Sequence, residues 1–398
     1  MPPTENRTLL LRGARLVLPD SIVERGQLHI EHGRISNLST ADEHFSASPS
    51  TTVLDLDGLT LFPGFIDIHI HGAIGVDTME ATTEDLRRVA QFLARHGVTA
   101  WLPTLVPAPV EDYAGAARAV EQLMREQDEY PDAAARALGL HYEGPFINSA
   151  QCGALRPPYF RTFRDASDLD ALATINLDGA RHLTTVAPEI EGGVDLVREL
   201  TKRGWIVSIG HTRATVDILD RARAAGAQHM THFLNAMSPL HHRAPGPIGW
   251  GLLHDDVTCD VIADGIHSDT LMLRLVLRCK TAQRVALISD AVAPTGMGDG
   301  DYRVWGETIT VKDGRTSNAR GSIAGSVITM NDAVRMMHTL GASPQDVARM
   351  AATNPARLLG IADLCGTIEE GKRADLVALD DEGKVQLTLV GGRVAFQV

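Results

Sequence analysis

The chain has 398 residues, 44% of them hydrophobic, and a net charge of −13 from 37 basic and 50 acidic residues. This length suits one large α/β barrel with an appendage, or two or three ordinary domains. The acidic balance argues against nucleic acid or an anionic membrane as a partner, so an anionic substrate needs a local basic group. Four scattered cysteines, no secretory signal and no apolar run of membrane-spanning length predict a cytoplasmic protein.

Short β-rich runs open the chain between residues 8 and 56, separated by turns such as RG and EHG. They predict a small antiparallel β unit. Similar β texture and tight turns return at the C-terminus, from Gly366 onward. The simplest arrangement joins both chain ends in one small β-sandwich domain, built from residues 1–62 and 363–398 around a barrel at 63–362.

Between the two ends, strand-like runs alternate with helical patterns. The first helical pattern has Thr82 or Thr83 as a predicted N-cap and Gly97 after its end. Eight such strand-helix units, over the roughly 250 residues that the fold needs, predict a (β/α)8 barrel. The predicted strands are residues 65–70, 98–103, 137–142, 182–187, 205–210, 228–232, 258–264 and 284–290.

Barrel enzymes place their chemistry at the C-terminal ends of the strands. Side chains that bind metals or move protons stand at most of these ends, namely His69 and His71, Glu143, His211, His232, Asp264 with His267, and Asp290. A lone histidine at a strand end is more often structural, and a His-x-His pair is a weak signal. Their joint placement on one rim favours metal ligands. Imidazole and carboxylate suit zinc in a catalytic site, although iron, manganese or cobalt would also bind them.

The positions of these residues at successive strand ends predict which of them bind metal and which transfers protons. Glu143, His211 and His232 supply three metal ligands and leave a position open for substrate. His69 and His71 could supply most of a second site, with Glu143 bridging. Asp290, at strand eight, would be the general base, and the alternative is an aspartate that only caps the next loop.

Two loops offer groups for binding. The long loop after strand six carries Arg243, a side chain type well suited to gripping a phosphate, although in isolation it is more often a surface charge. The segment GSIAGS, residues 321–326, could cradle a ligand with backbone amides or could be only a flexible turn.

Taken together, PGFIDIHIHG, LHYEGPFIN, GHTRA, HFLNAM, IADGIHSD, SDAVAPTGM and ATNPARLLG resemble the amidohydrolase superfamily. The resemblance covers nearly the whole chain in order. It is closest to the branch that deacetylates 6-phosphorylated N-acetyl amino sugars and releases acetate and the free amine. Hydantoinase-like relatives bridge their metals with a modified lysine on strand four, which the run HLTTVA lacks.

The resemblance implies Glu143, His211 and His232 as the primary metal site. Some members lack the histidine pair and use one metal, so His69 and His71 favour two divalent ions per subunit, with zinc expected. It also implies contacts with the sugar phosphate from Asn235 and Ala236, and from Arg243 acting across a homodimer interface. Further implied substrate contacts are Ala154, Leu155, Asp264, Gly265, Ile266, His267, Ile323, Ala324 and Gly325.

One position departs from the pattern. Leu155 stands where this branch usually has a histidine that polarises the substrate carbonyl, and leucine cannot donate a hydrogen bond. Either the metal polarises the carbonyl alone, Arg156 or His242 substitutes, or the substrate differs. The gluco and galacto epimers of the sugar both stay open. A non-catalytic binding protein is the alternative from another class, and it predicts eroded metal ligands.

Overall fold

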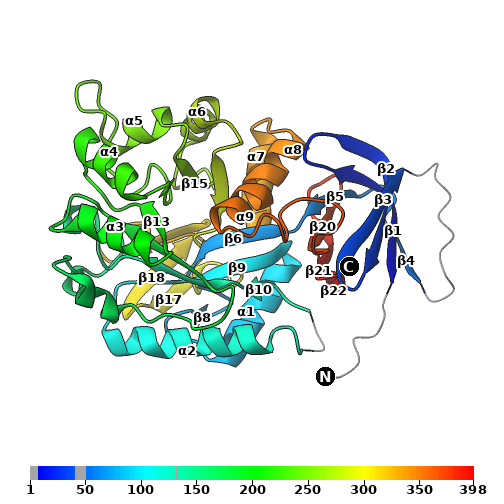
Figure 1. Cartoon of the computed structure of the whole chain (residues 1–398), viewed down its shortest axis with the longest axis horizontal. Coiled ribbons are helices and arrows are strands. Elements are labelled where there is room, and N and C mark those ends of the chain that lie inside the picture. The colour runs from blue at the N-terminus through cyan, green and yellow to red at the C-terminus, as the bar shows by residue number, and fades with distance from the viewer. Residues whose placement is uncertain (1–7, 41–50, 131–132) are drawn as a thin grey trace.

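A computed structural model describes residues 8–40, 51–130 and 133–398. Eight parallel strands form a nearly closed barrel with helices around it (Figure 1). Every strand-like run expected from the sequence is a strand here, which confirms the (β/α)8 fold. The barrel strands are β6 (Phe65–Ile70), β9 (Val98–Leu105), β11 (Gly139–Glu143), β12 (Arg181–Val186), β13 (Ile206–Ile209), β14 (His229–Met230), β15 (Thr258–Ile262) and β16 (Val285–Ile288). A short strand, β10 (Arg136–Ala137), pairs with β9.

The seam between the first and last barrel strands closes just beyond the strands themselves. The backbone N–H of Asp290 donates to the carbonyl of His69 at 2.9 Å, and the N–H of His71 donates to the carbonyl of Ala291 at 2.8 Å. These bonds bring the ends of β6 and β16 together. As a result, the histidine pair and Asp290 share one rim of the barrel.

The first barrel helix begins and ends where the sequence predicts. Thr82 caps α1 in a reciprocal capping box with Asp85, and Gly97 follows the helix in a left-handed conformation, so both predicted end signals are confirmed. The helices are α1 (Thr83–Arg95), α2 (Val110–Glu126), α3 (Gly193–Lys202), α4 (Val216–Ala225), α5 (Gly246–Leu253), α6 (Thr270–Lys280), α7 (Met330–Thr339), α8 (Pro344–Ala348) and α9 (Asn354–Leu358), with a π-helical turn at Arg349–Thr353 between the last two. No helix in the described ranges is both long and apolar enough to span a bilayer.

The two chain ends meet in a separate sheet beside the barrel, as expected (Figure 1). Its strands are β1 (Leu9–Val17), β2 (Ile22–Glu31), β3 (Arg34–Thr40), β4 (Thr52–Asp55), β5 (Thr60–Pro63), β20 (Leu376–Leu379), β21 (Val385–Val390) and β22 (Arg393–Gln397). The expectation of a purely antiparallel N-terminal unit is wrong, because β4 and β5 both pair with β1 in parallel. The chain crosses from β3 to the other edge of β1 instead of turning back on itself. The boundaries at residues 62 and 363 stay a prediction.

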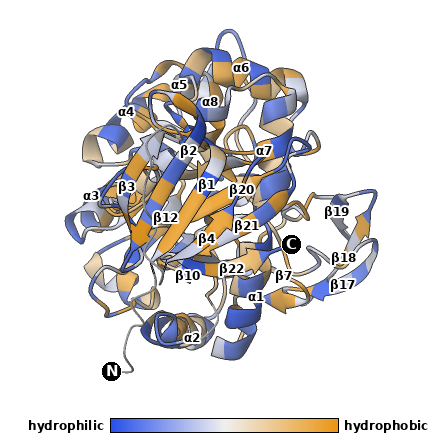
Figure 2. Ribbon diagram, turned by 90° about the vertical axis from the view of Figure 1, so that its right-hand side faces the viewer, coloured by the Kyte–Doolittle hydropathy of each residue, from blue (hydrophilic) through white to orange (hydrophobic). Residues whose placement is uncertain are grey.

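Two small elements decorate the rim of the barrel. After β6, β7 (Gly72–Ala73) and β8 (Val76–Asp77) form a tight hairpin. After β16, β17 (Gly300–Val304), β18 (Glu307–Lys312) and β19 (Arg315–Asn318) form a three-stranded sheet that projects to one side (Figure 2). This projecting sheet was not expected from the sequence.

Candidate metal centre and active site

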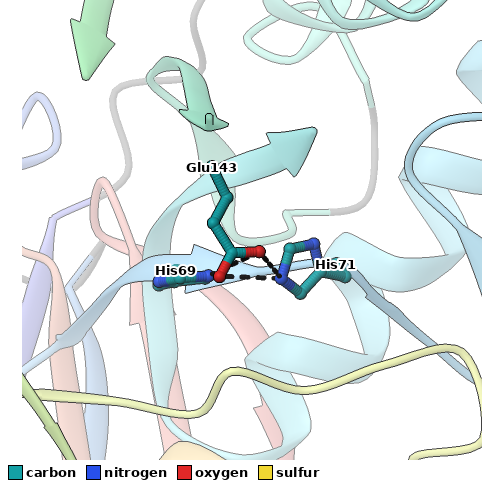
Figure 3. Close-up of side chains that lie close together, drawn as sticks. All are labelled: His69, His71 and Glu143. Carbon is teal, nitrogen blue, oxygen red and sulfur yellow. Dashed lines mark hydrogen bonds and ion pairs between the residues drawn. The ribbon is translucent and has the colours of Figure 1, made fainter. Parts of the chain in front are cut away.

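Four histidines converge on one carboxylate at the C-terminal mouth of the barrel. The Nε2 atoms of His211 and His232 lie 2.8 and 3.0 Å from Oε1 of Glu143. On the other side, Nε2 of His71 lies 3.3 Å and Nε2 of His69 lies 3.9 Å from Oε2 of the same glutamate (Figure 3). The two carboxylate oxygens therefore face two separate histidine pairs, and all five side chains are buried.

This donor set fits divalent metal ions. Within each pair the Nε2 atoms approach closely, at 3.2 Å for His69 and His71 and 3.1 Å for His211 and His232. At this separation both ring nitrogens of a pair could direct a lone pair at one ion when neither Nε2 carries a proton. Each pair together with Glu143 forms a group whose ligand atoms lie within 4.8 Å of one another. The two groups share Glu143, which is the geometry of a bridging carboxylate.

The pKa values of the cluster residues show that its buried carboxylates favour positive charge beside them. Burial lowers the pKa of His71, but hydrogen bonds to Asp290 and Glu143 outweigh it and raise the pKa to about 10. For His232 the bond to Glu143 likewise outweighs burial and raises the pKa to about 9. Burial raises the pKa of Glu143, yet the surrounding histidines hold it well below its usual value. The site thus balances its carboxylates with positive charge, which metal ions would also supply.

Asp290 lies at the edge of the cluster, where the sequence placed it. Its Oδ1 is 3.2 Å from Nε2 of His71 and 3.4 Å from Nε2 of His69. Burial raises the pKa of Asp290, but these two histidines lower it below its usual value, so the side chain is a carboxylate. It is not a member of either ligand group. A carboxylate beside a metal site, but outside the ligand set, is placed to exchange protons.

A residue that sequence reasoning did not assign holds the two halves of this rim together. Asp67 is fully buried on β6, and its carboxylate accepts hydrogen bonds from Ser289 Oγ at 2.5 Å, from Ser289 N at 3.3 Å and from His69 N at 3.4 Å. It therefore fixes the strand that bears His69 and His71 to the strand that leads to Asp290. The available signal was its place on the same strand face as the two histidines.

His232 has a similar support. Its backbone N–H donates to the Asp260 carboxylate, which also accepts from His229 at 2.9 Å. Asp260 lies on β15 and His229 on β14, so the neighbouring strand sets the turn that carries His232. A buried polar layer inside the barrel thus positions the ligand.

The residues expected at the sugar site lie on the same rim. The Asp264 carboxylate accepts from Nδ1 of His267 at 2.7 Å and from the N–H groups of Ile266 and His267 at 2.8 Å. Asp264 therefore orders the loop that includes Gly265 and fixes the ring of His267 through its Nδ1. In the loop after β14, the Asn235 amide nitrogen is buried without a hydrogen-bond partner among the described residues, as expected of a group that awaits a ligand.

The segment from Ile323 to Gly325 is built against Asp290. Ser326 N donates to the Asp290 carbonyl at 2.7 Å, so this segment follows the end of β16. Gly325 has φ +60, and a Cβ there would lie 2.8 Å from the Asp290 carbonyl oxygen and 2.5 Å from a methyl of Val292. Only glycine fits this approach, so GSIAGS is a fixed support and not a flexible turn.

Leu155 sits in an apolar cluster, packed with Val106, Ile147 and Ala187. The neighbouring Arg156 is engaged elsewhere, because its guanidinium donates to the Pro107 carbonyl at 3.2 Å and lies over the Tyr159 ring. Arg156 is therefore a poor substitute for a carbonyl-polarising histidine.

The loop that carries Arg243 is exposed at the surface. His242 stacks on His241, with ring centroids 4.4 Å apart, and both side chains are exposed. Arg243 is exposed too, and within the described part of the chain its backbone N–H donates to Nδ1 of His241 at 3.3 Å. The sequence-predicted phosphate ligand is thus not brought to the cluster by this chain alone.

Comparison with known proteins decides the family. The model of the amidohydrolase family matches residues 60–395. The chain belongs to the amidohydrolase family. It shares 34% identity with N-acetylglucosamine-6-phosphate deacetylase of Bacillus subtilis, over 98% of this chain and 97% of that one. It shares 35% identity with N-acetylgalactosamine-6-phosphate deacetylase of Escherichia coli, over 98% and 99% of the two chains.

Among solved structures, the chain is similar to an N-acetyl-D-glucosamine-6-phosphate deacetylase mutant from Mycobacterium smegmatis, in complex with N-acetyl-D-glucosamine-6-phosphate. The TM-score is 0.87 at 31% identity, covering 98% of this chain and all of the other. This amidohydrolase therefore shares its whole architecture with these relatives, including the sheet built from both chain ends.

Proposed function

We propose that this amidohydrolase is a cytoplasmic, metal-dependent deacetylase that hydrolyses N-acetylglucosamine 6-phosphate to glucosamine 6-phosphate and acetate, in amino-sugar catabolism. The observation that carries the proposal is the convergence of two histidine pairs on Glu143, with the Asp290 carboxylate beside them. Full-length relatives at 34–36% identity that carry this name support the choice of substrate. The intact ligand set disfavours a non-catalytic binding role.

We propose that Glu143, His211 and His232 would hold one ion and that His69, His71 and Glu143 would hold a second, with zinc favoured by the ligand types. Bound divalent metal polarises a carbonyl and lowers the pKa of water. The protein's part is to keep the site buried and the five ligands fixed.

Asp290 is the proton carrier in this proposal. It takes a proton from the water whose oxygen attacks the acetyl carbon, and it delivers a proton to the sugar nitrogen as the C–N bond breaks. Its lowered pKa keeps it a carboxylate and ready for the first transfer. The products are acetate and the free amine. Leu155 is apolar and Arg156 is engaged with the Pro107 carbonyl, so neither side chain is placed to donate a hydrogen bond to the acetyl carbonyl.

Arg243 is proposed to bind the sugar phosphate from the other subunit of a homodimer, together with Asn235 and Ala236 of the facing site. Its exposure, in contrast to the buried ligand cluster, leaves it free to reach a neighbouring subunit. A mixed dimer with Arg243→Ala in one subunit and Asp290→Asn in the other tests this. Action in trans places both lesions in one active site and leaves about half of the activity, whereas action in cis damages both sites and leaves almost none.

The galacto epimer is the second candidate substrate, because the Escherichia coli relative named for it is equally similar. Acetate release from a panel of N-acetyl sugars tests both readings. The panel contains the gluco and galacto forms, each with and without a 6-phosphate. The proposal expects the highest kcat/KM with the phosphorylated gluco form. A higher value for the phosphorylated galacto form would overturn the substrate and keep the reaction, and no acetate from any sugar would overturn both.

A further inference from the structure

Trp305 joins the projecting sheet to the metal cluster. It stands in the turn between β17 and β18, and its indole ring packs edge-on against the His71 ring, with centroids 5.2 Å apart at 81°. Trp305 also packs with the apolar cluster around Leu155 and with the buried side chains of the projecting sheet. The tip of the sheet is therefore fixed onto the His69–His71 half of the site.

The backbone at this tip is costly for a large side chain. Trp305 has φ 51 and Gly306 has φ 78, both in the left-handed region. A two-residue turn of this kind favours asparagine or glycine, and a bulky residue there is an outlier. A tryptophan in this position points to a role for its side chain beyond closing the turn.

The indole N–H has a complementary group nearby. Trp305 Nε1 is buried without a standard hydrogen bond in the described part of the chain, and so is Oδ2 of Asp77. Burial raises the pKa of Asp77 to about 6, while the backbone N–H of Met79, the charge of His71 and the nearby Trp305 indole oppose the rise. Asp77 lies on β8, directly after the loop that begins at His71. One side chain thus contacts both His71 and the strand that returns from it.

A cavity of about 500 Å³ lies on the outer side of Trp305. The carboxylates of Glu80, Glu111 and Asp112 line it, together with Arg156 and the tip of the projecting sheet. Trp305 therefore lines an acidic cavity and also contacts the ring of His71, which is only 1% exposed. An acidic cavity concentrates cations, and the indole connects that cavity to one of the ligands.

We propose that Trp305 is a positioning residue that holds His71 in place and controls exchange of the cation at the His69–His71 half of the site. This inference rests on the second metal of the proposed function. It assigns Trp305 no contact with the reacting atoms. Among the described residues the indole has its ring contact with His71 and none with His211 or His232, so faster exchange is expected at the His69–His71 half.

Metal release from the fully loaded protein tests this. Excess chelator is added to wild type, Trp305→Phe and Trp305→Ala, and the metal lost is counted over time. We expect Trp305→Ala to release one of two equivalents about tenfold faster, a barrier change of about 1.4 kcal/mol, with the other equivalent unchanged. Trp305→Phe keeps a ring but loses the N–H, so its rate should be intermediate. Thr308→Ala, exposed on β18, is the matched control.

A spectroscopic arm separates this role from a merely structural one. Cobalt(II) quenches a nearby indole, so loading one of the two equivalents should quench emission in wild type and in Trp205→Phe, but not in Trp305→Phe. Wild-type release rates in both Trp305 variants, or quenching that survives in Trp305→Phe, would overturn the proposal. A single metal equivalent in wild type would overturn it as well. Acetate release would then still support the proposed deacetylase function. Failure of the Trp305 proposal can therefore be told apart from failure of the proposed function.

Discussion

Replacing Asp290 with asparagine is the sharpest test of the proposed chemistry. Asp290 has φ 50, in the left-handed region that asparagine tolerates better than alanine does. The substitution therefore keeps the size and the backbone of the residue and removes only its charge and its ability to take a proton. Because the Glu143, His211 and His232 group is complete without it, metal should stay bound there.

The expected loss follows from the role assigned to this side chain. Removing a general base typically costs about 10²–10⁴ in rate, which is about 2.7–5.5 kcal/mol in the activation free energy. The loss should fall on kcat, measured by acetate release at saturating substrate. Metal content per subunit is measured on the same sample, together with the thermal unfolding midpoint.

A matched control is Asp313→Asn, an exposed aspartate that also has a positive φ, in the turn between β18 and β19. It should keep full activity. If Asp290→Asn turns over within about tenfold of wild type, a span of 1.36 kcal/mol, then Asp290 is not the base. If activity falls only in proportion to lost metal, Asp290 is a ligand and the division of roles proposed here is wrong.

Further predictions concern the metals, the phosphate and the seam of the barrel. Changing His69 and His71 together to asparagine should lower metal content from near two toward one per subunit, and an unchanged content by elemental analysis would refute the second site. Arg243→Ala should reduce kcat/KM about ten- to a hundredfold for the phosphorylated sugar and spare the unphosphorylated one, whereas equal losses would mean that the arginine only supports its loop. Asp67→Asn places an amide group where the donors of Ser289 and His69 now meet a carboxylate. The free energy of unfolding, measured in urea, should fall by about 1–3 kcal/mol. A variant as stable as wild type would refute the role of Asp67 in joining the first and last barrel strands. Removing metal with a chelator should lower the unfolding midpoint, and adding it back should restore it. A midpoint indifferent to metal would mean that the folded state does not bind it.

The barrel and the meeting of Glu143, His211 and His232 at its rim could be predicted because their signals are local. Apolar runs of strand length, alternating with helical patterns, mark each β/α unit. Parallel barrel strands then bring their C-terminal ends to one rim, so Glu143, His211 and His232 meet although they are far apart in the sequence. The rule needs only the strand ends and no knowledge of side-chain contacts.

The projecting sheet and Asp67 were missed for different reasons. The run ETITVKDGRT, at residues 307–316, alternates and contains a DG turn, which is a usable hairpin signal. The run follows the eighth barrel strand, where the alternation of strands and helices predicts only a loop. Asp67 carries no such signal, because its role depends on Ser289, more than two hundred residues away. The parallel pairing of β4 with β1 is likewise set by a crossover that no local pattern encodes.

The same left-handed backbone conformation follows three barrel strands. It helps to explain how the side chains of the site are held in position. His211, His232 and Asp290 each stand two residues beyond the last residue of their strand, with φ of 47, 31 and 50. A non-glycine residue in this region costs about 1–3 kcal/mol unless its surroundings hold it. Glu143 and His69, by contrast, lie within strands and take their direction from the strand itself.

The three left-handed residues therefore depend on supports from other segments. Asp260 holds the turn at His232, and the carbonyl of Gln151 accepts from Nδ1 of His211 at 2.7 Å. Ser326 holds the carbonyl of Asp290, in an approach that Gly325 alone permits. Because each support is specific to one residue, a change at a support should misplace one ligand or the base while the barrel stays folded. The positions of these three side chains thus depend less on the strands that precede them than on contacts from loops and neighbouring strands.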